Sequence, residues 1–385
     1  MTYKGFNQVA FARTSATTLA RHIREVEQAF LRNYQLGALL EANGRISYNH
    51  GGEGFDWPVQ YRTHSVEGNT GQTARNFQAR NLWKIANLEF RGYQATDTMY
   101  YKEFLSNRGE EGIVKVYDQF VERITTSVKQ ALGVEYYVDG NATGNETSWH
   151  GLETLFPTAS TAQTINSTVE GAVARTANAA DLVYHPNGTY AGINVTPGNY
   201  GGENESGKTW PDGIADSEFD FWSPIILNAN STHADVKTGA TAGWAVNGVE
   251  LMRWALIHAQ RNSAMDGQIT NVICSRDYYR KFLNLIDDKE RIVITGENSL
   301  RALGFKNVVV FDGIEVSWEV GVPSSQAYGL NYNQIELLSM DSMLLRSEGP
   351  EYDIYTQAFN AVVSTLSNMK FRSPRNFFKI YDGVA

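Results

Sequence analysis

The stretch "GGENESGKT", residues 201–209, fits the phosphate-binding loop of nucleoside triphosphate enzymes, in which two glycines enclose four residues and are followed by Lys and Thr. In a working loop an apolar strand leads into the glycines and a helix begins directly after them, so that its first N–H groups hold the phosphates. Here Pro197 and Gly198 precede the loop and Pro211 follows it, so both flanks lack the required element. We therefore interpret the stretch as an exposed loop.

Three acidic residues in "DSEFDFW", namely Asp216, Glu218 and Asp220, alternate along the chain and would share one face of a strand. Glycoside hydrolases need a pair of carboxylates beside the scissile bond. With Trp210 and Trp222 as platforms for sugar rings, the pattern gives one alternative function, a β-rich carbohydrate-active enzyme or lectin. Alternating acids on an exposed strand are far more common than a catalytic pair, so this function stays the alternative.

The remaining residue types with catalytic chemistry form no recognisable site. The seven histidines are never three or four residues apart, so no helical pair of metal ligands is present. The single cysteine, Cys274, excludes an intramolecular disulfide and a thiolate zinc cluster. We expect no catalytic residue, no metal and no cofactor, and the sequence predicts a protein that is not an enzyme.

The composition is that of a folded, acidic protein. The chain of 385 residues is 42% hydrophobic and 19% charged, which is enough for a sizeable core. Its formal net charge of -9 argues against a surface that grips nucleic acid throughout. The first 35 residues differ, because they hold five basic and only two acidic side chains. No stretch is apolar over the length of a membrane span, so no membrane contact is expected.

Four stretches carry apolar residues at the three- and four-residue spacing of an amphipathic helix. The first covers 17–40, and the second, the longest, lies within 110–136. Two further helices are expected near 249–263 and 276–287, and Ser275 is a suitable N-cap for the last of them. The helix within 110–136 is long enough to serve as a spine for the surrounding structure.

A two-stranded ribbon is expected between the first two helices. In "FDWPVQYR" the apolar side chains alternate with polar ones, and Pro58 places this strand at an edge. A polar stretch, 63–82, separates it from a second extended run, "WKIANLEFRGYQ". Such a ribbon cannot bury a face by itself, so it needs a surface to lie on. If its own domain does not provide that surface, another subunit must.

The second half of the chain reads as short strands and one clear hairpin. Residues 139–240 are rich in Gly, Asn and Thr, with strand candidates at "LVYH", "YAGINV" and "FDFWSPIIL". In "VVVFDGIEVSWEV" the pair Asp312-Gly313 suits a two-residue turn with positive φ. The alternation after this turn predicts an apolar face and a polar face, the latter formed by Glu315, Ser317 and Glu319.

This order of elements resembles that of the major capsid proteins of tailed bacteriophages, which have the Hong Kong 97-like fold. Several stretches are similar to segments of such proteins: "GLETLF" after the long helix, "YAGINV", "FDGIEVSWEVGVPSSQAYGLNYNQIEL" and "KFRSPRNFFKI". The resemblance extends over most of the chain, although residues 157–240 match loosely.

The resemblance implies an α+β fold and a division into parts. These parts are an N-terminal arm and helix (1–45), an extended loop or β-ribbon (46–100), a peripheral domain (101–240) with a spine helix (110–136), an axial α/β domain (241–345), and C-terminal strands that return to the peripheral domain (346–385).

It also implies where subunits meet each other and the genome. Contacts between subunits are expected along the extended loop, at Arg62, Glu67, Arg75, Arg80 and Trp83. The arm is expected at the inner surface of the shell, with Arg13, Arg21 and Arg24 facing DNA or a scaffold. Some members of the family crosslink subunits through a Lys of this loop, but residues 63–83 hold no Lys, so no autocatalytic crosslink is expected.

The implied function is that of a structural protein of the virion. Copies of the chain would assemble in the host bacterial cytoplasm into hexamers and pentamers of an icosahedral head around double-stranded DNA. The implied partners are the chain itself, a separate scaffolding protein, a portal, a decoration protein, and packaged DNA through non-specific contacts. No membrane is among them.

Overall fold

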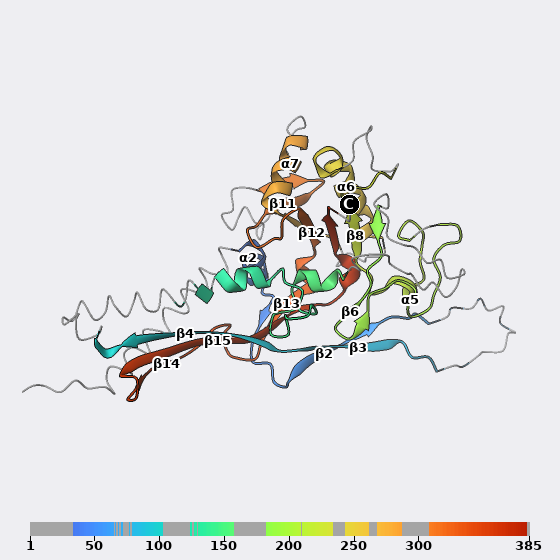
Figure 1. Ribbon diagram of the computed structural model, residues 1–385. Coiled ribbons are helices and arrows are strands. Elements are labelled where there is room, and N and C mark those ends of the chain that lie inside the picture. Colours follow the sequence, from blue (N-terminus) through green and yellow to red (C-terminus); the bar gives the residue numbers. More distant parts are fainter. Residues whose placement is uncertain are drawn as a thin grey trace, which may run out of the picture.

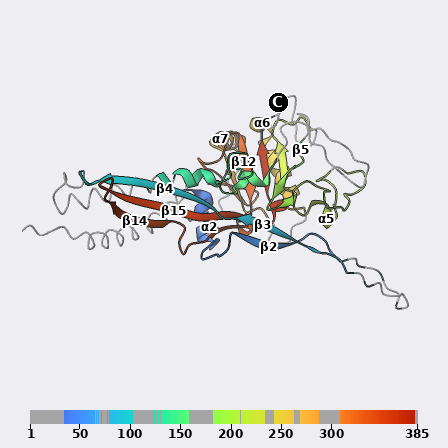
Figure 2. The same ribbon diagram turned by 60° about the horizontal axis from the view of Figure 1, so that its bottom comes forward.

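The computed structural model shows two β-rich arms that leave a central body in opposite directions, a shape visible in both views (Figures 1 and 2). The residues that the structure describes are 34–64, 66, 68, 71, 77, 79–102, 124, 127–128, 130–157, 182–208, 210–233, 243–261, 268–286 and 308–382. Among them, no helix combines the length and the apolar character needed to cross a membrane.

The left arm in Figure 1 is built around one long strand, β15 (Ala358–Phe371). Its first half lies between β14 (Arg346–Asp353) and β4 (Arg91–Tyr100), and its second half pairs with β13 (Ile335–Ser339). The short strand β1 (Ile46–Ser47) completes this five-stranded sheet by pairing with β13 in parallel. Side chains of β15 alternate in burial over its first half, as expected for a sheet with one covered face.

The central body contains a seven-stranded mixed sheet. Its spatial order is β10 (Val308–Phe311), β11 (Ile314–Trp318), β9 (Asn271–Cys274), β12 (Gln326–Leu330), β16 (Phe378–Tyr381), β8 (Ile225–Asn228) and β5 (Val183–Tyr184). Strands β8 and β9 are buried at every position, because neighbouring strands and packed side chains cover both of their faces.

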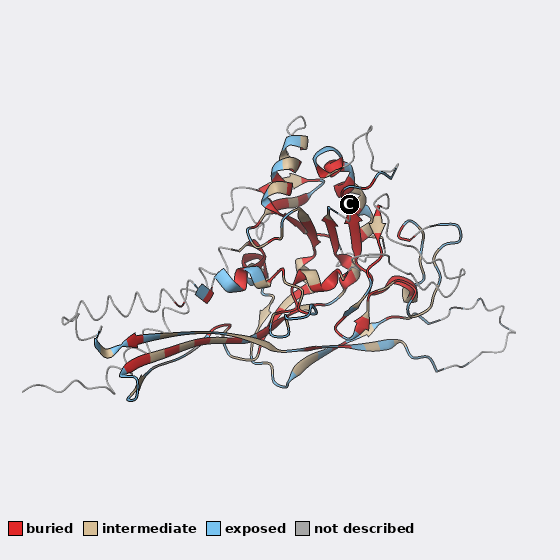
Figure 3. Ribbon diagram, viewed as in Figure 1, coloured by how far each residue is buried: buried red, intermediate tan, exposed pale blue. Residues whose placement is uncertain are grey.

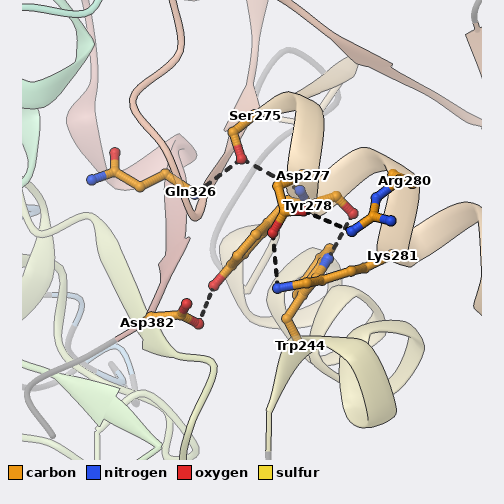
Figure 4. A network of polar contacts seen from close by, with 8 residues as sticks. All are labelled: Trp244, Ser275, Asp277, Tyr278, Arg280, Lys281, Gln326 and Asp382. Carbon is orange, nitrogen blue, oxygen red and sulfur yellow. Dashed lines mark hydrogen bonds and ion pairs between the residues drawn. The ribbon is translucent and has the colours of Figure 1, made fainter.

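Two helices pack on this sheet, α6 (Trp244–Ala259) against β8 and β16, and α7 (Arg276–Ile286) against β9 and β11. The indole of Trp244 stacks on the ring of Tyr278 at 4.6 Å between centroids, and its Nε1 donates to the Tyr278 carbonyl at 2.8 Å. The Tyr278 hydroxyl donates to Asp382 at 2.6 Å, so this tyrosine joins both helices to the segment after β16 (Figure 4).

Several sequence predictions for this body are confirmed. Helix α7 occurs where it was expected, and α6 occurs but begins at Trp244 and ends at Ala259, earlier than the predicted 249–263. The Ser275 hydroxyl accepts from the Tyr278 N–H at 3.5 Å. The hairpin of β10 and β11 turns at Asp312 and Gly313, whose φ angles are +48° and +82°. The predicted polar face of β11 is wrong, because Ser317 is fully buried. Helix α7 packs against β11, and within the strand Ser317 is buried like Val316, whereas Glu315 and Trp318 are half-buried.

The predicted helices of the first half are described in part. Helix α2 (Gln35–Ala42) covers the end of the predicted 17–40 helix, and residues 17–33 lie outside the described residues. Of the predicted spine helix, residues 124, 127–128 and 130–135 are helical, and 110–123 lie outside the described residues. Ile124, Val128 and Leu132 are buried, as the apolar stripe predicts.

Short elements connect these parts. They are η1 (Leu152–Leu155), β6 (Thr189–Tyr190), β7 (Ile193–Asn194), α5 (Ser217–Asp220), η3 (Tyr332–Gln334) and η4 (Pro374–Asn376). Buried residues concentrate in the seven-stranded sheet and beneath α6 and α7 and continue along β15 in the left arm, whereas many residues of β2, β3 and β4 are exposed (Figure 3).

The two large sheets combine segments that the sequence placed in different parts. Strand β8 comes from the range 101–240 and β16 from 346–385, and both lie in the sheet of β9 and β12. Strand β13 comes from the range 241–345 and pairs with β15. Sheet membership therefore crosses the predicted limits at 240 and at 345.

Candidate functional site

The ribbon predicted from the sequence forms the second arm. Strands β2 (Gly54–Gln60) and β3 (Trp83–Glu89) pair antiparallel, with Trp57 opposite Ala86 and Gln60 opposite Trp83. Pro58 lies in β2, which pairs with β3 alone among the described strands, so its predicted edge position is confirmed. Only Phe90 separates β3 from β4, so one nearly continuous strand runs along the bottom of the molecule from one arm to the other (Figure 1).

The two faces of the ribbon differ in exposure. Trp57, Ala86 and Leu88 are buried on the inner face, with exposed fractions of 7%, 0% and 5%. On the outer face Ile85 is 70% exposed and Trp83 is 54% exposed. Large apolar side chains are seldom displayed together on a two-stranded ribbon without a partner. The outer face is therefore a candidate docking surface.

The inner face docks on the ribbon's own chain. The Trp57 ring lies 6.4 Å from the Tyr190 ring, and the Tyr61 ring lies 5.8 Å from Phe221, both measured between centroids. The backbone N–H of Asn87 donates to the Ala191 carbonyl at 3.1 Å. The base of the ribbon thus finds in its own subunit the surface that the sequence required.

Two cations hold the ribbon where it leaves this base. Arg62 Nε donates to Glu218 Oε2 at 2.5 Å, and this hydrogen bond is the main cause that raises the pKa of Arg62. Lys84 Nζ lies 3.9 Å from the centroid of the Tyr200 ring and 5.0 Å from that of Tyr61, which is cation–π geometry. Both cations are linked to residues outside the ribbon and so fix the direction in which it projects.

The residues predicted as assembly contacts are placed unequally by the structure. Arg62 is engaged with Glu218 in its own chain, Trp83 lies on the outer face, and Arg80 is exposed. Glu67 and Arg75 lie outside the described residues, and so do the arm residues Arg13, Arg21 and Arg24.

Sequence reasoning missed Ile85, Phe77 and Val66, although Phe77 is 87% exposed and Val66 is 96% exposed. The alternation that buries Trp57 opposite Ala86 also places Ile85 beside Trp83 on the other face. That signal was present in the sequence and identifies Ile85. Phe77 and Val66 lie in the polar stretch, where no period marks them.

The predicted strand with three aligned carboxylates is wrong. Residues 217–220 form the short helix α5, so acids two residues apart no longer share a face. Asp220 is buried, accepting from Trp210 Nε1 at 3.1 Å and from Arg261 Nε at 2.9 Å. Glu218 is paired with Arg62, and Asp216 accepts from the backbone N–H of Glu203.

The two tryptophans considered as binding surfaces for sugar rings are also buried. Trp210 is 4% exposed and Trp222 is 1% exposed, so neither ring face is open to a ligand. The Trp222 Nε1 donates to the Tyr190 carbonyl, and Tyr190 itself packs on Trp57. Trp222 belongs to the core under the ribbon and Trp210 to the core beneath α6 and α7, so the carbohydrate alternative loses its site.

The phosphate-loop pattern is an exposed loop, as predicted. Gly207 and Lys208 are exposed, and the next helix, α5, begins only at Ser217. Among the described residues, no helix therefore begins directly after Lys208, as a phosphate-binding loop would require. In the same part of the chain, no three His, Cys, Asp or Glu residues are grouped so as to hold a metal ion.

Comparisons with known proteins identify the architecture. No protein-family model and no curated protein matches the sequence. Among solved structures, a chain from the capsid asymmetric unit of cyanophage A-1(L) is similar with a TM-score of 0.56 at 15% identity, over 91% of this chain and 93% of that one. A chain from the capsid of a native GTA particle gives 0.50 at 10% identity, over 90% of this chain and 91% of that one.

Identities this low carry the fold and nothing more. The likeness nevertheless spans nearly the whole of each chain. The α+β architecture expected from the sequence is confirmed: the chain has the Hong Kong 97-like fold of phage capsid proteins.

Proposed function

We propose that the chain is a major capsid protein, whose copies assemble into hexamers and pentamers of an icosahedral phage head that encloses double-stranded DNA. The observation that carries this proposal is the likeness to the cyanophage A-1(L) capsid chain over 91% of the sequence. A shell subunit needs no catalytic residue and no cofactor, and its work is done by surfaces that bind other copies.

The outer face of the ribbon is the surface we assign to a neighbouring subunit. It presents Trp83 and Ile85, and Phe77 and Val66 are exposed further along the same loop. Burying one such side chain against a partner contributes about 1.5–3 kcal/mol. A single ribbon contact of this size is weak, but a closed shell repeats it many times, and repetition stabilises the whole.

The other partners follow from the same role. We propose a separate scaffolding protein, a portal and a decoration protein, with packaged DNA bound non-specifically through the basic N-terminal arm. The mature protein would reside in the virion after assembly in the bacterial cytoplasm, as a structural protein and not an enzyme.

The proposal is tested by the size of the particles that the chain forms in expressing bacteria. Sedimentation velocity and negative-stain electron microscopy should show megadalton shells for the natural chain. Ile85→Asp should reduce their yield at least about tenfold, because a carboxylate cannot be buried against a neighbour without a partner. The matched control is Ile257→Asp on α6, since Ile257 is 67% exposed and Ile85 is 70% exposed.

The outcomes separate clearly. A chain that stays a monomer or a small oligomer, even when it is expressed together with the scaffolding protein proposed above, would overturn the capsid proposal. Equal losses for Ile85→Asp and Ile257→Asp would leave the capsid role in place but would remove the ribbon face as a specific contact.

A further inference from the structure

A buried carboxyl joins the beginning of α2 to the end of β11. Glu319 directly follows β11 and is only 4% exposed. Its Oε2 accepts from the backbone N–H of Leu36 at 3.2 Å, in the first turn of α2. Beside it, Gln35 Nε2 donates to the Trp318 carbonyl at 2.9 Å. The first turn of α2 is thus held by two consecutive residues of the central body.

The end of the spine helix closes the same junction. A Cβ added to Gly133 would lie 1.9 Å from the Tyr34 ring, so the tyrosine before α2 rests directly on this helix. A Cβ added to Gly321 would lie 2.5 Å from the Gly133 carbonyl oxygen. Three segments therefore meet here: the loop after β11 approaches the end of the spine helix backbone to backbone, and the start of α2 reaches it through the Tyr34 ring.

No cation balances the carboxyl at this junction within the described part of the chain. The charged and titratable groups that act on Glu319, or on the tyrosines beside it, are Tyr34, Glu41, Tyr48, Tyr136, Tyr137 and Tyr328. The hydroxyl of Tyr136 and the side-chain oxygen of Gln35 are buried without a hydrogen-bond partner among those residues. A negative charge here faces only acids, phenols and one helix N-terminus.

Burial dominates the electrostatics of this group. It raises the pKa of Glu319 from the ordinary 4.5 to about 7, although the hydrogen bond from the Leu36 N–H favours the charged form and lowers the pKa in part. The folded junction therefore prefers the protonated carboxyl at pH values where an exposed glutamate is ionised.

We propose that Glu319 is a proton-dependent clip, which fixes the start of α2 to the central body when protonated and loosens when ionised. Protonation removes the unpaired buried charge and leaves an oxygen free to accept from Leu36. Ionisation restores the charge, and opening of the junction then gains the hydration of the carboxylate.

The sign of the effect follows from the two pKa values. Below the ordinary 4.5 the carboxyl is protonated in both the closed and the open junction, and the clip has its full strength. Between that value and about 7 the open form releases its proton while the closed form keeps it, so the opening equilibrium grows with pH. Above about 7 both forms are ionised and the opening equilibrium levels off at its higher value.

The test is hydrogen exchange of the full chain followed by mass spectrometry, with rates corrected for the intrinsic effect of pH. Protection of the amides of α2 should fall at least about tenfold between about pH 5 and about pH 7.5, as one proton is released. In Glu319→Gln, whose side chain has nearly the same shape without a charge, protection should be equal at both pH values. Amides of β15 serve as the internal reference.

The matched control is Glu41→Gln, which removes the one carboxylate that α2 itself carries and should keep the natural pH dependence. The proposal is overturned if protection of α2 in the natural chain does not change over this range. It is equally overturned if Glu319→Gln keeps the natural decrease, or if Glu41→Gln abolishes it.

Discussion

Asp220, which the sequence offered as a candidate catalytic acid, is buried among basic side chains in the structure. Its carboxylate is buried and accepts from Arg261, and Arg375, also largely buried, lies close enough to be attracted by it. Burial lowers the pKa of both guanidinium groups, and the attraction of Asp220 opposes this. The carboxylate is therefore a structural counter-ion, not a catalytic acid.

This position gives a stability prediction. Asp220→Ala would leave Arg261 and Arg375 buried without their carboxylate, so we expect the free energy of unfolding to fall by about 3–5 kcal/mol. The control, Asp216→Ala, removes an exposed carboxylate whose one backbone hydrogen bond comes from Glu203, and should cost about 1 kcal/mol or less. Urea unfolding followed by tryptophan fluorescence measures both. Similar losses in the two variants would contradict the assigned role.

The sequence allowed only part of this site to be predicted. The alternation in "DSEFDFW" fits a strand, but the structure forms the short helix α5 there instead. In this helix Glu218 pairs with Arg62 and Asp220 pairs with Arg261, both distant along the chain. No local pattern encodes those partners, because they lie 156 and 41 residues away along the chain. The exposed loop at 201–208 was predictable, since its flanking prolines and glycines act locally.

At the scale of elements, the ribbon was predicted because its signal is local. Alternation identified the inner face, and the structure buries Trp57 and Tyr61 on that side. The hairpin of β10 and β11 was found for the same reason, from its turn residues. The burial of Ser317 and Glu319 was not predicted, because it depends on which strands and segments pack beside β11, and that choice is made by distant residues.

Shortening the ribbon tests its role as an element. Replacing Val66 to Gln78 by two glycines removes the outer part of the loop and keeps Trp57 and Tyr61, which anchor the base. We expect an unchanged circular dichroism spectrum and no closed shells in sedimentation velocity, because the subunit core is retained while the contact with a neighbour is lost. Persisting shells would show that the loop makes no essential contact, and outright unfolding would assign it to the core of its own subunit.

At the scale of the whole molecule, the sequence indicated the fold class but not the order of the strands in the sheets. The order of elements was enough to indicate the fold class, because helix and strand periods follow each other in an unusual succession. The sheet order was not predictable. The pairing of β16 with β8 and β12, and of β13 with β15, joins segments far apart in the sequence, and the pattern of each strand is compatible with several partners.

The basic N-terminal arm gives a prediction for the assembled particle. Arg13, Arg21 and Arg24 lie outside the described residues, in a segment with five basic and two acidic side chains. Changing all three to Gln should lower the yield of DNA-filled heads and weaken its dependence on salt, because each lost phosphate contact reduces counter-ion release. Filled and empty heads separate on a density gradient. An unchanged proportion of filled heads would place these arginines elsewhere.

The central position of β16 has a consequence for how the protein is made. Strand β8 pairs with β16 from Ile225 opposite Phe378 onward, so roughly 150 residues must be synthesised before β8 acquires this neighbour. At ordinary rates of translation that interval is on the order of ten seconds, and throughout it β8 lacks its β16 partner on one edge. Chains growing side by side on one messenger RNA would present this unpaired strand edge, with its free backbone N–H and C=O groups, to each other. The ribosome-bound chain, more than the finished subunit, is therefore the form that most needs a chaperone.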